Sequence, residues 1–214
     1  MGYASIADEL ERRDRDTSKG RLEAFSDGVL AIVITIMVLE LTPPAGTALD
    51  DLAALWPKFL SYALSFVSLA IYWVNHHHLF QAARVVNGRV LWANVLLLFF
   101  LSLIPFGTAW MGEHSFAATP VFVYGVLLLL PPIAYAFLTR ALIGVPGQPP
   151  TIATGIGSDI KGRLSIAAYV VALPIALVFP LAAVAIYVLV AAVWIAPDPR
   201  IERALKGSEA GRLG

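Results

Sequence analysis

The chain has 214 residues, of which 58% are hydrophobic and only 14% are charged, whereas an ordinary soluble domain carries about 25% charged residues. Its formal net charge is zero and it contains no cysteine, so disulfides, thiolate catalysis and cysteine-based metal sites are excluded. The apolar content exceeds what the core of a soluble domain of this size buries, and it predicts an integral membrane protein.

Long apolar segments recur along the chain. Each is close to the roughly 20 residues that an α-helix needs to cross about 30 Å of hydrocarbon. The expected fold is therefore an all-α integral membrane protein with six transmembrane helices. The last two are short and separated by Pro180, so they form either a hairpin or one long bent segment. The predicted spans are 22–41, 53–75, 88–111, 118–141, 163–179 and 180–196.

Polar segments flank this apolar region. A charged arm, 1–19, precedes a six-helix domain, 20–196, and a polar tail, 197–214, follows it. A mixed-charge stretch of some twenty residues comes before the first apolar run, so the N-terminus does not look like a secretory signal peptide.

Positively charged residues cluster in every second segment that flanks or connects the predicted spans. Lys and Arg precede the first span, lie between the second and third and between the fourth and fifth, and follow the last one. The loops 42–52 and 112–117 contain neither, and Lys58 is the single exception on their side. The positive-inside rule therefore predicts that both termini are cytoplasmic. An even number of spans is then required, which agrees with six.

The first span begins with polar side chains, among them Ser26 and Asp27. An ionisable group inside a span costs about 2.5–3.5 kcal/mol on insertion scales and usually faces other helices or a wet cavity. Two interpretations follow. Ser26 and Asp27 either cap the start of the helix at the interface, or they form a buried hydrogen-bonded cluster with other helices.

Partners for such a cluster are predicted on the same side of the membrane. The second span ends in WVNHHHLF, and the third carries Asn94 one or two turns from its start. Consecutive helical residues point about 100° apart, so the three histidines cannot all face one partner. We expect Asp27, one histidine and Asn94 to meet at one depth.

The histidine run is a poor match to a metal site or an enzyme. Zinc ligands on one helix normally follow i, i+4 spacing, and no HxxxH is present. The chain also lacks a Ser/His/Asp arrangement, an HExxH and a glycine-rich phosphate loop. We expect no bound metal, no cofactor, no enzymatic activity and no nucleic-acid partner.

One stripe of the first helix is almost wholly apolar. Ile32, Thr35, Ile36 and Leu39 follow i, i+3, i+4 and i+7 spacing and so share one helix face. From periodicity alone, an ordinary helix-packing face is the better interpretation.

Four motifs, in order, resemble one known family. RLEAFSDGVLAIVIT resembles the first-helix signature of the bacterial relatives of the lysosomal potassium channel called transmembrane protein 175. WVNHHHLF resembles the end of that family's second helix, Asn94 its third-helix asparagine, and Pro105-Phe106 the proline–aromatic pair beyond it. The motifs cover about residues 20–110, and the remainder agrees only in span count and topology.

The resemblance implies a potassium-permeable channel without a P-loop, in the plasma membrane of a bacterium. Its pore would be central in a homotetramer and lined by four copies of the first helix, surrounded by membrane lipids. Ile32 would form the narrow apolar constriction, with further rings at Thr35 or Ile36 and at Leu39. A second group would hold the pore helix in register, with His76 preferred because it stands three residues after Trp73. This helix-locking polar network comprises Arg21, Phe25, Ser26, Asp27, Trp73, His76 and Asn94.

Two other classes of function stay open. A proton-coupled secondary transporter would use Asp27 and His76 as a proton relay, and it would be expected to show an internal repeat with discontinuous helices. We find no such repeat. A non-conducting membrane scaffold is the other class, because an apolar stripe alone does not require a pore. Proton conduction is a variant of the channel hypothesis, since animal members of the family are described as passing protons.

Overall fold

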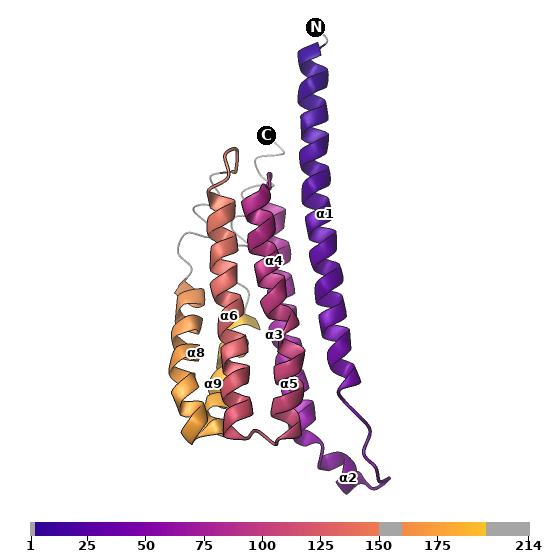
Figure 1. The fold of residues 1–214 in the computed structure, drawn as a ribbon, viewed down its shortest axis with the longest axis vertical. Helices are drawn as coiled ribbons and strands as arrows, with labels where there is room; N and C mark the ends of the chain where they lie inside the picture. The colour runs from indigo at the N-terminus through magenta and orange to yellow at the C-terminus, as the bar shows by residue number, and fades with distance from the viewer. Residues whose placement is uncertain (1–2, 150–159, 196–214) are drawn as a thin grey trace.

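The computed structural model describes residues 3–149 and 160–195, with side chains from residue 18 onward. All regular elements in these ranges are helices (Figure 1), so the expected all-α fold is confirmed. The helices are α1 (Tyr3–Leu39), α2 (Leu49–Ala53), α3 (Trp56–Ala82), α4 (Gly88–Ser102), α5 (Ile104–Glu113), α6 (Ala118–Ile143), α8 (Ile160–Val178) and α9 (Pro180–Ile195).

Five segments in the described ranges are long and apolar enough to cross a membrane, which makes this a multi-pass membrane protein. The sixth predicted span corresponds to α9, an apolar helix of only 16 residues. Helices α8 and α9 lie side by side and form a hairpin (Figure 1), so one long bent segment is excluded. The five spans are Ser18–Leu39, Trp56–Ala82, Gly88–Glu113, Ala118–Ile143 and Ile160–Val178.

The third predicted span is divided into α4 and α5. Pro105 lies in the first turn of α5, where it has no N–H to donate to the carbonyl of Leu101. Helix α4 ends at Ser102, whose Oγ donates to the carbonyl of Phe99 at 2.7 Å. The interruption between α4 and α5 therefore lies just before the proline.

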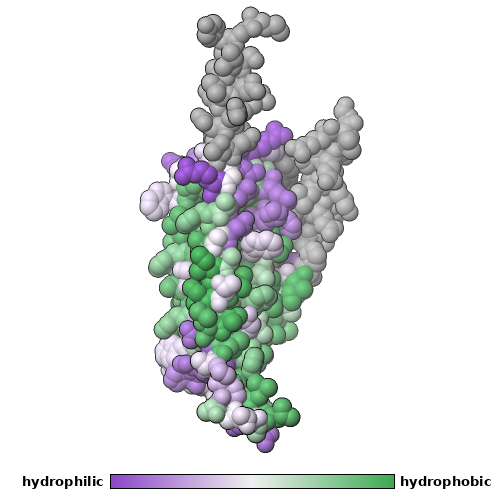
Figure 2. All heavy atoms as spheres, turned by 90° about the vertical axis from the view of Figure 1, so that its right-hand side faces the viewer, coloured by the Kyte–Doolittle hydropathy of each residue, from purple (hydrophilic) through white to green (hydrophobic). Residues whose placement is uncertain are grey.

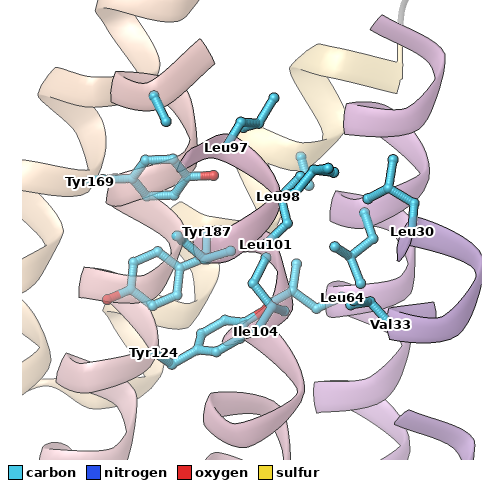
Figure 3. Close-up of a cluster of buried hydrophobic side chains, with 14 of the residues drawn as sticks. Leu30, Val33, Leu64, Leu97, Leu98, Leu101, Ile104, Tyr124, Tyr169 and Tyr187 are labelled. Atoms are coloured by element: carbon cyan, nitrogen blue, oxygen red, sulfur yellow. The ribbon is translucent and has the colours of Figure 1, made fainter. Parts of the chain in front are cut away.

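Helix α1 lies at the edge of the bundle and is continuous from Tyr3 (Figure 1). Its buried side is a single stripe at i+3 and i+4 spacing, which packs against α3, α4 and α5. Leu30 and Val33 of this stripe contact the leucine-rich core shown in Figure 3. The complete stripe is Leu22, Ser26, Leu30, Val33 and Met37.

The α1 side of the molecule is apolar between two hydrophilic ends, as Figure 2 shows. The end that holds the α3–α4 connection includes Arg84 and Arg89. The opposite end holds α2, with Asp50 and Asp51 in its first turn. Such a hydrophobic belt with charged ends is what a bilayer-spanning bundle requires.

Candidate functional site on the first membrane helix

Ser26 and Asp27 lie far inside α1. The helix begins at Tyr3, several turns earlier, and it continues without a break to Leu39. An N-cap residue lies at the first turn and bonds to free backbone N–H groups there. The interpretation of Ser26 and Asp27 as helix caps is therefore wrong, and their side chains bond to other partners.

A buried chain of hydrogen bonds joins α1, α3 and α4. Asn94 Nδ2 donates to Ser26 Oγ at 2.8 Å, and His76 Nε2 lies 2.8 Å from Asn94 Oδ1. An amide oxygen only accepts, so His76 donates from Nε2. The Ser26 hydroxyl in turn donates to the carbonyl of Leu22 at 2.8 Å. Ser26, Asn94 and His76 are at most 2% exposed, so each bond is shielded from solvent and lipid.

Asp27 makes a separate contact to the same neighbouring helix. Trp73 Nε1 donates to Asp27 Oδ1 at 3.0 Å. Both side chains are exposed in the single chain. Because Trp73 and His76 are three residues apart on α3, they lie on adjacent turns of one face. Two neighbouring residues of α1 are thus tied to α3, one directly and one through Asn94.

The three histidines of α3 have different surroundings. His76 is buried in the network, and its ring also packs against Phe80 at a centroid distance of 4.6 Å. His77 is exposed and stacks on Trp73 at 6.1 Å, while His78 is half-buried. Among the residues that the structure describes, no three His, Asp or Glu side chains converge as a metal site would need.

Arg21 and Phe25 lie away from this network. Phe25 is seven residues before Ile32 and four after Arg21, a spacing that places all three on one side of α1. Phe25 is 58% exposed. Within the described residues, no hydrogen bond joins either side chain to Ser26, Asn94 or His76. The structure therefore gathers five of the seven residues that the resemblance grouped together.

The four residues of the predicted stripe are all exposed in the single chain. Ile32 is 59% exposed, Ile36 44% and Leu39 76%. The Thr35 hydroxyl lies 2.9 Å from the carbonyl of Ala31 and 3.0 Å from that of Ile32, so its proton is satisfied within α1. Among the described residues, no other helix covers this face. The stripe is therefore not a helix-packing face within one chain.

A second polar cluster, which the sequence reasoning missed, lies behind the C-terminal half of α1. Ser65 Oγ lies 2.6 Å from Thr108 Oγ1 and 2.8 Å from Tyr124 Oη. Thr108 donates to the carbonyl of Ile104 at 2.8 Å. Its oxygen is then free to accept from Ser65, and Ser65 in turn accepts from Tyr124. Thr108 Oγ1 also contacts Met37 Sδ at 3.9 Å. A usable signal was the row of serines at 61, 65 and 68 of α3, spaced i, i+4 and i+7.

Removing the Thr108 hydroxyl is expected to loosen this cluster. Thr108→Val keeps the shape of the side chain and deletes the bonds to Ser65 and Ile104, at a cost of about 1 kcal/mol. We expect the midpoint of thermal unfolding in detergent to fall by roughly 2–4 °C. Thr139→Val is the matched control, because the Thr139 hydroxyl bonds only to the carbonyl of Ala136 on its own helix. Equal unfolding midpoints for Thr108→Val and Thr139→Val would show that the bonds between helices in this cluster stabilise the protein no more than one bond within a helix does.

Comparison with known proteins agrees with this arrangement. A sequence profile described as "Endosomal/lysosomal potassium channel TMEM175" matches residues 21–105. A Chryseobacterium protein named as a potassium channel is 49% identical over 189 residues, which cover 88% of this chain and 98% of that protein. The chain belongs to the TMEM175 family. The resemblance predicted from the four motifs is confirmed, and since the family consists of ion channels, this TMEM175 homologue is not an enzyme.

The likeness extends beyond the motif-bearing half. A crystal structure from Chamaesiphon minutus, described as a lysosomal potassium-selective channel TMEM175 homolog, matches with a TM-score of 0.74 and 28% identity. The match covers 84% of this chain and 97% of that one. The mouse relative, named an endosomal/lysosomal proton channel, is 34% identical over 115 residues, only 23% of its length.

Proposed function

We propose that this TMEM175 homologue is a potassium-permeable channel of four identical subunits, with α1 lining a central pore. One observation carries the proposal. Helix α1 is anchored on one side by buried hydrogen bonds, and on its opposite side Ile32, Thr35 and Ile36 are left exposed by the part of the chain that the structure describes. The names of the Chryseobacterium and Chamaesiphon relatives support potassium as the permeant ion.

The proposed constriction is a ring of Ile32 side chains. Four such side chains around one axis form an apolar neck that excludes water when it is narrow, so an ion must shed part of its hydration shell to pass. Potassium holds its water less tightly than sodium, which gives a modest preference for potassium. Thr35 lies almost one turn further along α1, and its oxygen replaces part of the lost water.

The exposed face of α1 also suits close association between copies of the chain. Ala24, Gly28 and Ala31 are small residues exposed on this face, and a Cβ added to Gly28 would meet no atom within 4 Å. Small residues at such spacing allow helix backbones to approach in membranes. Arg21 and Phe25 share this face, so we propose that their contribution to holding α1 is made against a neighbouring subunit.

The proposed topology places both ends of the chain in the cytoplasm and has six crossings of the bacterial plasma membrane. Helix α9 supplies the sixth crossing. Its 16 residues extend about 24 Å at 1.5 Å per residue. A span slightly shorter than the hydrocarbon layer is accommodated by local thinning of the bilayer.

The test is a reversal potential. The purified protein is placed in a planar bilayer with potassium chloride on one side and sodium chloride on the other. We expect ohmic current whose reversal potential is displaced toward the potassium equilibrium value. Absence of current at all voltages, from protein shown to be folded and tetrameric, would overturn the channel. A potential that follows an imposed pH gradient instead would assign proton conduction, the activity in the mouse relative's name.

A further inference from the structure

A small cavity lies between α3, α6, α8 and α9, away from α1 (Figure 1). Its volume is about 50 Å³. A single water molecule needs roughly 10–15 Å³ of cavity, whereas a cavity that binds benzene measures about 150 Å³. The size therefore suits a small cluster of water molecules and excludes larger ligands.

The Tyr169 hydroxyl has no hydrogen-bond partner among the described residues, although the side chain is only 7% exposed. Tyr169 belongs to a cluster of three buried tyrosines (Figure 3), in which the other two hydroxyls are bonded. Tyr124 Oη lies 2.8 Å from Ser65 Oγ, and Tyr187 Oη donates to the carbonyl of Val121 at 3.3 Å. A buried tyrosine hydroxyl normally finds a partner, so the Tyr169 hydroxyl requires one that the described residues do not supply.

The Tyr169 oxygen borders the cavity. Tyr169 is part of the cavity lining. In the described part of the chain, every fully enclosed side-chain nitrogen or oxygen has a hydrogen-bond partner. Because the Tyr169 hydroxyl has none, its oxygen is not fully enclosed, and a molecule of the size of water reaches it. Almost all of this side chain is buried, so the cavity is the space that the oxygen faces.

Two side chains of α3 line the same cavity and have unused acceptor capacity. Ser68 Oγ donates to the carbonyl of Leu64 at 2.8 Å, and Asn75 Nδ2 donates to the carbonyl of Ile71 at 2.8 Å. Hydroxyl and amide oxygens also accept hydrogen bonds, and neither of these oxygens accepts one from another described residue. A water molecule both accepts and donates, so it is able to pair with Tyr169 on one side of the cavity and with α3 on the other.

We propose that this cavity binds ordered water, which accepts a hydrogen bond from Tyr169 Oη and donates to the oxygens of Ser68 and Asn75. Water is held where it finds two to four polar partners, and these three residues provide that number. The water joins α8 to α3 through the interior of the bundle. Asn75 directly precedes His76, so one turn of α3 contacts both the water and the buried network that holds α1. The water site does not depend on ion conduction, so its test is separate from that of the proposed channel.

Radical footprinting of the purified protein in detergent tests for the bound water. X-rays split water into hydroxyl radicals, and a buried side chain is oxidised rapidly only where a water molecule lies beside it. A scavenger in the bulk solution removes radicals formed outside the protein, and mass spectrometry gives the oxidation rate of each tyrosine. We expect Tyr169 to be oxidised at least about tenfold faster than Tyr124 and Tyr187, which are buried and already hydrogen-bonded. Equal rates at the three tyrosines would overturn the site.

Two adjacent alanines of α9 provide a matched test of where the water lies. Ala191 is 7% exposed and lines the cavity, whereas Ala192 is exposed on the outside. Ala191→Val adds two methyl groups inside the cavity, and Ala192→Val adds the same groups outside it. We expect the oxidation rate of Tyr169 to fall at least about fivefold in Ala191→Val, because the methyl groups displace water, and to stay at the wild-type value in Ala192→Val. An unchanged rate in Ala191→Val would overturn the cavity as the water site.

Removing the Tyr169 hydroxyl distinguishes a hydrated cavity from a dry one, and it does not depend on the folding of Ala191→Val. If water bridges Tyr169 to α3, Tyr169→Phe deletes a stabilising hydrogen bond, and the midpoint of thermal unfolding should fall by roughly 2–4 °C. In a dry cavity the same change removes an unpaired buried hydroxyl, and the midpoint should rise instead. A midpoint equal to or above that of wild type would therefore contradict the water bridge.

Discussion

Replacing Ile32 by asparagine is expected to raise the single-channel potassium current at least about tenfold. A ring of amides lets water enter the neck, so an ion keeps more of its hydration shell while it passes. A tenfold increase in rate corresponds to a barrier lowered by about 1.4 kcal/mol. The measurement is single-channel conductance in symmetric potassium, with the potassium-to-sodium permeability ratio taken from the same bilayers. We expect that ratio to fall toward one.

Two controls separate the constriction from a general effect of mutation. Ile32→Leu keeps an apolar side chain of the same size, and its conductance should stay within about twofold of wild type. Val171→Asn introduces the same amide on α8, at a residue that is 57% exposed and away from α1. An increase in Val171→Asn as large as that in Ile32→Asn, or unchanged current in Ile32→Asn, would remove Ile32 from the proposed neck.

Loss of the Asn94 amide is expected to be the most destabilising change among the polar residues. Asn94→Leu leaves His76 Nε2–H without its acceptor and removes the donor to Ser26. Each buried polar group left unpaired costs about 1–3 kcal/mol, and one such group lowers the unfolding midpoint by roughly 2–12 °C at about 2–4 °C per kcal/mol. Because α1 is held through this amide, the fraction of the proposed tetramer on size exclusion with light scattering should also fall.

The control for Asn94 is Asn75, one of the two other asparagines in the chain. The Asn75 side chain donates only to the carbonyl of Ile71 on its own helix, so Asn75→Ala should change neither tetramer fraction nor midpoint comparably. A double-mutant cycle between Ser26→Ala and Asn94→Ala then measures the bond between α1 and α4. Bonds of this kind in membranes average about 0.6 kcal/mol and reach about 1.7. Additive effects would show that α1 is held by packing alone.

Much of the fold was predictable because the bilayer imposes one dominant requirement. Each span must be long, apolar and helical, so five predicted spans agree with the helices of the structure. Helix α9 is the exception, since its sequence is apolar throughout but Pro180 limits its length at one end. Where an apolar run ends is decided by proline and by packing as well as by hydropathy.

The candidate site was predictable in part. Polar residues inside a span must find partners, which predicted that Asp27, one histidine and Asn94 would meet. The structure instead joins Ser26 to Asn94 and His76, and Asp27 accepts a hydrogen bond from Trp73. This reasoning does not predict which side of α1 packs against the other helices of the chain and which side stays exposed. Ile32 and Val33 are equally apolar, yet the first is exposed and the second buried. Only the positions of α3, α4 and α5 distinguish the two, and those positions depend on contacts far apart in the sequence.

The internal hydrogen bonding of Thr35 has a consequence for biogenesis. Its hydroxyl donates within α1, so a lone subunit leaves no unpaired donor from this residue when the exposed face meets lipid tails. Assembly of the proposed tetramer would therefore not be needed to satisfy this hydroxyl. In that tetramer, the association of subunits would depend on the apolar and small residues of the exposed face, and its extent would rise with the number of subunits per area of membrane.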